Sequence, residues 1–491
     1  MSDTPIATVV DFQYINLFRT PKHHYCYDAH TNAILELDKA TWQKLKSGQE
    51  AAINPRQTPN KGHLEVLNQV LGEGGLEVGG RAQAMRSPWK QSQLEEELSK
   101  SLTQLTLVVS EACNLRCTYC MYGDHYPDFR KHSTLLMKSN TAKRSIDFFL
   151  ERCKKDEPVS IGFYGGEPLI NFDLIEFCLT YASQQYPSKH QHLGFTMTTN
   201  GTLLNSEAVD VLQEYNVMLA ISLDGPKDIH DHNRIASDGS GSFNKIVRNL
   251  RYLKEKYPEF YQHNLMFSVV LAPETDLFRV YQLFNSENGL FHNQPVLVSF
   301  IRPYSTTVFE TLGTATSVGM EKIETRFIEK AKLGTLSNDY FLRDLIGRPL
   351  SVIHKRKHWN GFSDIIPPNG ICLPGRRKIL VEPGGDIKFC ERIGTDKNIG
   401  NIRSGFDYAK VWDSIQEYIE ISEEDCLSCW AVRLCRLCFA HAYQGEISLD
   451  QKREVCFGNR ENISGDLQLY CRALEQNPSA LDFINNNLSE N

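Results

Sequence analysis

The run Cys113-Asn114-Leu115-Arg116-Cys117-Thr118-Tyr119-Cys120 is the part of the chain whose residue types and spacing point most directly to chemistry. Three thiolates on one short loop can bind three irons of a four-iron cubane and leave the fourth iron without a protein ligand. An open iron can bind a substrate or a cofactor. Three close cysteines are also compatible with free thiols or with part of a zinc site, so the surrounding segments have to separate these alternatives.

The loop, with Tyr119 before its last cysteine, resembles the signature of the radical S-adenosylmethionine (radical SAM) family. The resemblance extends over residues 100–460 and implies that the open iron chelates the amino and carboxylate groups of the cofactor. Reductive cleavage of the cofactor then gives a 5'-deoxyadenosyl radical that abstracts a hydrogen atom from the substrate. In such an enzyme the cofactor supplies the chemistry and the protein supplies placement.

A second motif, Gly165-Gly166-Glu167-Pro168, follows the next predicted strand and resembles the glycine-glycine-glutamate element of the same family. Two glycines allow the backbone to approach a ligand closely, and the Glu167 carboxylate suits an ammonium group. The resemblance to sulfatase-maturing and peptide-maturing enzymes implies that Ser222 and Arg234 bind the cofactor's carboxylate and ribose. Asn200 and Asp224 either contact the cofactor or cap turns through side-chain hydrogen bonds to the backbone.

Seven further cysteines form a second array near the C-terminus. The paired spacing could make one zinc site, but Gly385 before Cys390, the pairs and a distant last cysteine resemble the SPASM domain, which carries two auxiliary four-iron clusters. The resemblance assigns one cluster to Cys426, Cys429, Cys435 and Cys456, and a cluster nearer the cofactor to Cys372, Cys390 and Cys438.

The array departs from the SPASM pattern in two ways. Two residues rather than the usual three separate Cys435 from Cys438, and no cysteine lies just upstream of Cys372. The nearer cluster therefore has an open iron or is completed by Cys471. Glu391 follows Cys390, where sulfatase-maturing relatives have an aspartate proposed as the base, which makes Glu391 the candidate proton acceptor or else a surface carboxylate. Three other cysteines are expected to be small buried hydrophobic residues: Cys26, Cys153 and Cys178.

The elements that must position these residues alternate between strand and helix. Apolar, β-branched runs predict strands at 102–110, 159–163, 193–198, 218–223, 265–271 and 296–301. Helical patterns between them include 138–152, 171–184 and 206–215. This alternation predicts a parallel sheet in an α/β fold, a partial (β/α)6 barrel of the TIM type with its chemistry at the carboxyl ends of the strands.

A separate unit precedes the barrel. Short strands are expected at residues 12–18, 24–27 and 32–37, then a helix over 39–46 that Asp38 caps and Gly48 ends, and a second helix through residues 64–71. This order resembles the winged-helix-like element of ribosomal-peptide (RiPP) maturases, which binds a leader peptide as an added strand. The predicted organisation is 1–80 leader recognition, 81–100 linker, 101–310 radical SAM barrel, 311–365 helical bridge, 366–475 SPASM domain and 476–491 C-terminal tail.

Composition limits the functional classes. Of 491 residues, 41% are hydrophobic and 23% are charged, as in ordinary globular proteins. We expect no membrane span, no signal peptide and a cytoplasmic location, in which fourteen cysteines indicate metal rather than disulfides. A net charge of −7 disfavours nucleic-acid binding.

These observations predict an oxidoreductase with S-adenosylmethionine and three [4Fe-4S] clusters. It would crosslink a ribosomally made precursor peptide by a thioether or carbon–carbon bond, with flavodoxin or ferredoxin as a suitable electron donor. Three alternatives stay open: a sulfatase maturase that forms formylglycine, a maturase for a crosslinked subunit of a redox enzyme, and a non-catalytic iron–sulfur or zinc adaptor.

Overall fold

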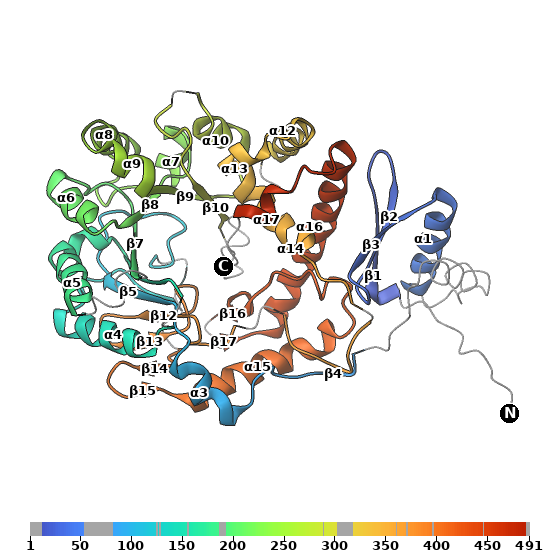
Figure 1. Cartoon of the computed structure of the whole chain (residues 1–491), viewed down its shortest axis with the longest axis horizontal. Coiled ribbons are helices and arrows are strands. Elements are labelled where there is room, and N and C mark those ends of the chain that lie inside the picture. The colour runs from blue at the N-terminus through green and yellow to red at the C-terminus, as the bar shows by residue number, and fades with distance from the viewer. Residues whose placement is uncertain are drawn as a thin grey trace.

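A computed structural model describes residues 12–53, 82–123, 126, 129–154, 157–185, 193–287, 289–301, 318–359, 361–369, 372–394, 397–444 and 446–487. A curved ten-stranded sheet organises most of the molecule, and helices cover its outer face (Figure 1). Six strands run parallel in chain order, which confirms the predicted runs: β5 (Gln104–Ser110), β6 (Val159–Gly165), β7 (Leu193–Thr199), β8 (Met218–Ser222), β9 (Leu265–Leu271) and β10 (Val296–Phe300).

The helices between these strands lie close to their predicted ranges. They are α4 (Ser139–Arg152), η3 (Pro168–Asn171), α5 (Phe172–Gln185), α6 (Ser206–Glu214), α7 (Lys227–Asn233), α8 (Phe243–Lys256), α9 (Pro258–Asn264) and α10 (Leu277–Phe284). Local capping explains one of the starts, because the side chain of Asn205 accepts a hydrogen bond from the Ala208 amide at the beginning of α6.

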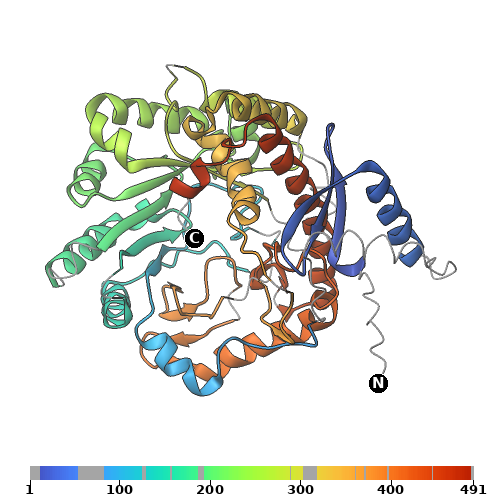
Figure 2. The ribbon, with the colours of Figure 1, turned by 45° about the vertical axis from the view of Figure 1, so that its right-hand side comes forward.

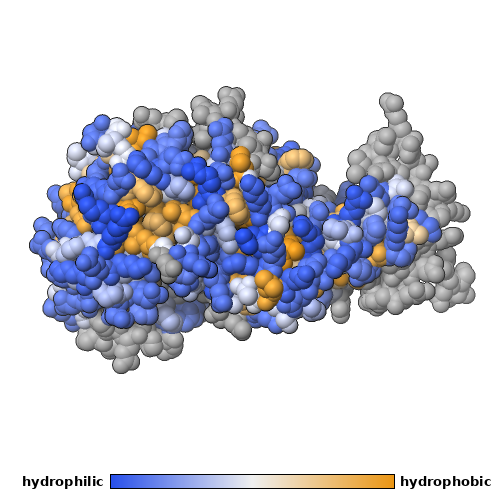
Figure 3. All heavy atoms as spheres, turned by 90° about the horizontal axis from the view of Figure 1, so that it is seen from above, coloured by the Kyte–Doolittle hydropathy of each residue, from blue (hydrophilic) through white to orange (hydrophobic). Residues whose placement is uncertain are grey.

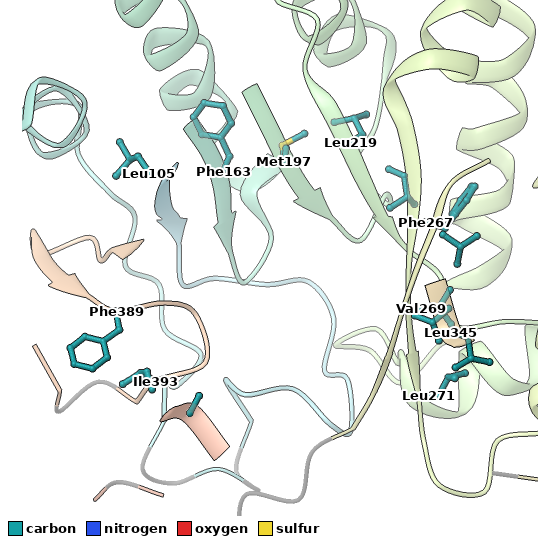
Figure 4. Packing of buried hydrophobic residues seen from close by; sticks show 14 of the residues in the cluster. Leu105, Phe163, Met197, Leu219, Phe267, Val269, Leu271, Leu345, Phe389 and Ile393 are labelled. Atoms are coloured by element: carbon teal, nitrogen blue, oxygen red, sulfur yellow. The ribbon is translucent and has the colours of Figure 1, made fainter. Parts of the chain in front are cut away.

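Alternation along the strands separates a core from a cavity. Leu105, Phe163, Met197 and Leu219 occupy successive strands and are almost fully buried in the main core (Figure 4). Their neighbours in sequence, among them Thr106, Gly162 and Thr196, line a cavity on the other face. A period of two along parallel strands therefore gives an apolar outer face and a more polar inner one.

The sheet continues into the cysteine-rich part of the chain. β12 (Lys378–Val381) pairs in parallel with β5, and antiparallel strands follow: β13 (Asp386–Lys388), β14 (Gly400–Asn401) and β15 (Gly405–Phe406). The remaining C-terminal elements are α15 (Tyr408–Cys426), η7 (Phe439–His441), β16 (Tyr443–Gln444), β17 (Glu446–Ile447), α16 (Leu449–Gln476) and α17 (Phe483–Asn487). One sheet thus joins the segment that carries Cys390 to the segment that carries Cys113.

Short elements connect the larger ones. The bridge is helical where it is described, with α12 (Met320–Leu333), η5 (Leu336–Asn338), α13 (Tyr340–Leu342), the π-helical turn η6 (Arg343–Gly347) and α14 (Arg348–His354). The expected linker packs against the rest of the chain: β4 (Ala84–Met85) pairs with β11 (Ile365–Ile366), and η2 (Gln91–Gln93) leads into α3 (Leu94–Ser99). Met85, Leu94 and Leu98 are fully buried.

The N-terminal unit has the three expected strands. After η1 (Phe12–Tyr14), β1 (Ile15–Arg19), β2 (His24–Asp28) and β3 (Ala33–Leu37) form an antiparallel sheet in that order, followed by α1 (Lys39–Ile53). The unit stands beside α16, with α1 on its outer side (Figures 1 and 2). The second helix expected through residues 64–71 lies outside the described residues.

The prediction that Gly48 ends α1 is wrong. Asp38 caps the helix as expected, because its Oδ1 accepts from the amides of Ala40 and Thr41 at 2.9 and 3.0 Å, but the helix runs on to Ile53. A Cβ atom at Gly48 would lie 2.7 Å from Cζ of Phe12. The glycine therefore allows a close approach between η1 and α1 rather than a helix end.

The N-terminal unit is held to the cysteine-rich part by buried contacts. Arg433 donates from Nε to the Ala29 carbonyl at 2.6 Å, and Tyr25 donates from its hydroxyl to Glu475 at 2.9 Å. The ring of the fully buried Tyr27 meets Trp430 edge-on, with 6.2 Å between centroids.

In the described part of the chain, no helix is long and apolar enough to cross a membrane. The face drawn in Figure 3 is mostly hydrophilic with separate apolar patches.

Candidate active site

The loop of Cys113, Cys117 and Cys120 begins directly after β5, at the carboxyl end of the parallel sheet. Backbone amides of Leu115 and Tyr122 donate to the sulfurs of Cys113 and Cys120, each at 3.4 Å. Burial raises the pKa of the Cys113 thiol to about 11 and that of Cys117 to about 12. Three half-buried thiols, two of which accept amide hydrogen bonds, are a donor set that fits an iron–sulfur cluster.

A cavity of about 1610 Å³ opens beside this loop. Its lining includes the three cysteines and most of the side chains and glycines that the sequence assigned to the cofactor: Tyr119, Gly165, Gly166, Asn200, Ser222 and Arg234. These residues come from the carboxyl ends of β5 to β8. The topology thus brings five separate sequence segments to one wall, as the rule for parallel sheets predicts.

Tyr119, Asp224 and Arg234 form a buried group at that wall. Asp224 Oδ2 accepts from the Tyr119 hydroxyl and from Arg234 Nε, the latter at 2.9 Å, and Oδ1 accepts from the Val270 amide at 3.0 Å. The guanidinium of Arg234 lies 5.4 Å from the centre of the Tyr119 ring. Asp224 is fully buried and is not among the residues that line the cavity, so it orients the other two from behind.

The glycine-glycine-glutamate turn packs tightly against the cysteine loop. Gly165 has φ of 135°, and a Cβ atom at Gly166 would lie 2.4 Å from the carbonyl oxygen of Ala112. The two glycines are therefore needed for the approach of β6 to the loop.

Glu167 lies behind this turn and is fully buried. One carboxylate oxygen accepts from Leu169 N at 3.1 Å and Thr199 Oγ1 at 2.7 Å, and the other accepts from Asn200 N at 2.8 Å. Burial raises the pKa of Glu167. Both carboxylate oxygens bind the chain itself, and Pro168 begins η3 directly after it.

Asn200 caps a turn, which is one of the two roles that the sequence left open, and it also contacts the cysteine loop. Its Oδ1 accepts from the amide and hydroxyl of Thr202 at 2.9 and 2.6 Å, which caps the turn, while its Nδ2 donates to Asn114 Oδ1 at 2.9 Å. The same Nδ2 lies 3.9 Å from the Cys113 sulfur. Asn200 therefore joins the end of β7 to the cysteine loop.

The second cysteine array separates into two groups. Cys390 interacts electrostatically with Cys372 and Cys438, the inner group. Cys435 does so with Cys426, Cys429 and Cys456, the outer group. These are the groupings that the resemblance to SPASM domains implies. In the described part of the chain, no group of three His, Cys, Asp or Glu side chains is placed so that it could hold a single metal ion.

Cys471 lies away from Cys456 of the outer group. It is buried on α16, fifteen residues after Cys456, which corresponds to about 22 Å along the helix. Its electrostatic neighbours include Glu475 and Arg356. The other three cysteines expected as buried hydrophobes, Cys26, Cys153 and Cys178, are buried.

Glu391 lines the same cavity as the cysteine loop. Its Oε2 lies 2.7 Å from Nζ of Lys378, which also lines the cavity. Burial alone would raise the pKa of Glu391, but Lys378 outweighs burial and brings that pKa below its ordinary value. The buried Arg130 donates to the Glu391 carbonyl at 2.8 Å and to Glu382 at 3.2 Å, which fixes the turn.

Sequence reasoning missed several residues of this region, namely Arg130, Lys378, Thr199, Lys452, Asn459 and Arg460. Most of them carry no local signal, because their partners are far away in the chain. The exception is the spacing of Lys452, Cys456, Asn459 and Arg460, which places all four on one face of a helix.

Comparisons with known proteins agree with this geometry. Residues 107–277 match the model of the Radical SAM superfamily. The chain is 31% identical over 197 residues to a cysteine-type anaerobic sulfatase-maturating enzyme of Clostridium novyi, and 28% identical over 221 residues to the radical SAM cyclopropyl synthase TigE of Paramaledivibacter caminithermalis. These matches take in 39% and 43% of this chain, and 50% and 44% of those relatives, about half of their length.

A solved structure of native anSMEcpe with bound AdoMet and a Cp18Cys peptide has the same fold, with a TM-score of 0.53 at 22% identity. That likeness covers 79% of this chain and 100% of the solved one. The matched segment, residues 107–277, contains the cysteine loop, the glycine-glycine-glutamate turn, Ser222 and Arg234. Residues 107–277 are thus a radical SAM domain, and the members of the superfamily that shares this domain are enzymes.

Proposed function

We propose that this protein is a radical SAM maturase that crosslinks a residue within a ribosomally made precursor peptide. The observation that carries the proposal is the shared cavity. Cys113, Cys117 and Cys120 line one side of it, while Glu391, Arg392 and Arg436 line it from the segment that holds the second cysteine array. A substrate residue in this cavity would lie between both sets of cysteines.

The residues present fit three [4Fe-4S] clusters and one S-adenosylmethionine. Cys113, Cys117 and Cys120 would hold the first cluster, and the inner and outer groups would hold two auxiliary clusters. Tyr119, Gly165, Gly166, Ser222 and Arg234 would contact the cofactor, while Glu167 and Asp224 hold the turns behind them. When bound, these groups supply a radical that removes a hydrogen atom and an acceptor for one electron.

Glu391 is the proposed proton acceptor. Closing a thioether or carbon–carbon bond removes two hydrogens from the peptide, one as an atom and the other as a proton plus an electron. Lys378, 2.7 Å away, keeps the Glu391 carboxylate ionised and able to accept that proton at Oε1 or Oε2. The electron would pass through the auxiliary clusters to a carrier such as flavodoxin or ferredoxin.

The N-terminal sheet is the proposed site for the precursor's leader. Within the described residues β3 pairs with β2 alone, so the outer edge of Ala33–Leu37 carries no further strand. The opposite edge strand, β1, lies against α16, where Asn16 Nδ2 donates to Ser464 Oγ at 3.2 Å. A peptide could therefore add to β3 through main-chain hydrogen bonds.

Hydrogen exchange tests this proposal without a variant. We expect the amides of β3 to exchange more slowly when a precursor peptide that carries its leader is added, because β-augmentation ties up their outward N–H groups. The β1 amides serve as the internal control and should not change. A core peptide without its leader should leave β3 unprotected, and equal protection of β1 and β3 would contradict the proposal.

Formylglycine formation is the second candidate, favoured by the similarity to the Clostridium novyi enzyme. A cysteine that becomes formylglycine exchanges its sulfur for oxygen, which mass detects, but a serine that becomes formylglycine loses two hydrogens, as a crosslinked peptide does, so mass alone does not separate those two products. The formylglycine aldehyde reacts with a hydrazide and a crosslink does not. Incubation of anaerobically reconstituted protein with either peptide, followed by hydrazide labelling, decides between the two activities. The Cys113/Cys117/Cys120 triple alanine variant is the control for both.

A further inference from the structure

Helix α16 presents a charged stripe to the outer cysteine group. Lys452, Cys456, Asn459 and Arg460 follow one another at spacings of four, three and one, which places them on the same face of the helix. Three of these side chains reach other cysteines of the group. We call Lys452, Asn459 and Arg460 the α16 stripe.

The contact made by Lys452 carries the largest cost of burying a charge. Only 4% of the residue is exposed, and its Nζ lies 3.5 Å from the sulfur of Cys426. Among the described residues no carboxylate lies within ion-pair distance of this ammonium. A buried cation is costly unless an anion faces it. Cysteines that become anionic as thiolate ligands face it here, and the Asp425 carboxylate also interacts with it electrostatically.

Asn459 and Arg460 extend the same pattern. Asn459 Nδ2 donates to the Cys435 sulfur at 3.5 Å. Arg460 hydrogen-bonds to Cys429 and acts electrostatically on Cys456. Every cysteine of the outer group is thus either contacted by a donor of the α16 stripe or lies on its face of the helix.

The inner group has a different environment. Glu391 follows Cys390 directly and acts on its thiol as a like charge. Lys378 is paired with that carboxylate at 2.7 Å, so the two charges largely neutralise each other. Positive charge and N–H donors at the sulfurs stabilise the reduced, more negative state of an iron–sulfur cluster. The two groups therefore differ in the factors that set a reduction potential.

We infer that the α16 stripe raises the reduction potential of a cluster held by the outer group above that of the inner one, so that an electron taken from the substrate moves outward. The inference rests on the auxiliary clusters of the proposed function. Lys452, Asn459 and Arg460 are positioning residues in this scheme, because they act on the acceptor through its cysteines and do not touch the substrate.

Redox titration of anaerobically reconstituted protein, followed by electron paramagnetic resonance, tests the inference. Replacing Lys452 by methionine keeps the length of the side chain but removes its charge. We expect the reduction equilibrium constant of the outer cluster to fall at least about tenfold, which is 59 mV for a one-electron couple. K452R should restore most of the potential. The control is Arg472→Met, which removes a charge about 30 Å away on the same helix and whose side chain pairs with Glu324 at 3.4 Å.

The possible results are separable. If K452M binds fewer irons than the wild-type protein, Arg460→Met is measured instead, because Arg460 is only half-buried. The reduction potential of the outer cluster should fall in this variant too. Unchanged potentials in K452M and R460M, or an equal shift in R472M, would overturn the inference. Wild-type protein that contains only one cluster would instead refute the proposed cofactor set, whatever Lys452 does.

Discussion

Asp224 shows how a buried carboxylate can organise a site that it does not line. Its two oxygens hold Tyr119, Arg234 and the β9 backbone at once, so the orientation of two side chains at the cavity wall depends on one acid. Glu167 likewise holds the turns after β6 and β7, because its carboxylate oxygens accept hydrogen bonds from both turns. At the scale of the residue, both acids named from the sequence hydrogen-bond to side chains and turns beside the cavity.

Replacing Asp224 by asparagine should weaken S-adenosylmethionine binding at least about tenfold, or about 1.4 kcal/mol. The amide keeps the shape but leaves the Arg234 guanidinium buried without a counter-charge. Equilibrium dialysis with reconstituted protein measures the affinity. Asp228→Asn is the matched control, because Asp228 forms an exposed bidentate pair with Arg279 at 2.8 Å. Equal losses in both variants would contradict the assigned role.

At the scale of the element, the alternation of strands and helices could be predicted from the sequence, but the packing of the elements against one another could not. The six parallel strands follow from β-branched runs such as that of β5, and the positions of the site residues follow from strand ends. The pairing of β12 with β5 had no local signal, because four residues are too short to reveal their partner. Gly48 is the opposite case, since a glycine that looks like a helix end serves a contact with Phe12.

The turn after β6 offers a test at this scale. Gly166→Ala should place a methyl group 2.4 Å from the Ala112 carbonyl oxygen and so displace the start of the cysteine loop. We expect 5'-deoxyadenosine formation to fall at least about tenfold while the fold persists, because only the loop must move; such a change corresponds to about 1.36 kcal/mol. Chromatography of the cleaved cofactor and circular dichroism measure the two effects.

Gly194→Ala on the neighbouring strand is the control for this variant. Its Cβ would meet nothing closer than the Val159 carbonyl oxygen at 3.9 Å, an ordinary contact. Normal cofactor cleavage in G166A would show that the close approach of β6 to the loop is not required.

At the scale of the whole molecule, three cysteines line one cavity, and seven more lie in the segment from which Glu391, Arg392 and Arg436 also line it. If all ten are ligands, anaerobically reconstituted protein should contain roughly eleven to twelve irons per chain. Alanine at Cys113, Cys117 and Cys120 should remove roughly four of these and abolish cofactor cleavage, while the signals of the other clusters persist. Iron analysis and electron paramagnetic resonance give the counts. Stoichiometric zinc beside a single cluster would contradict the assignment.

Arg433 and Trp430 lie between Cys429 and Cys435 in sequence, and both contact the N-terminal unit. Metal binding that orders residues 429–435 also orders the surface on which Ala29 and Tyr27 rest, since the free energy of metal binding is spent on folding. If, as proposed, the N-terminal unit binds a precursor and the outer cysteine group holds a cluster, the two binding equilibria would be thermodynamically linked, and each would favour the other equally. An apoprotein would then bind the precursor more weakly than the loaded protein does.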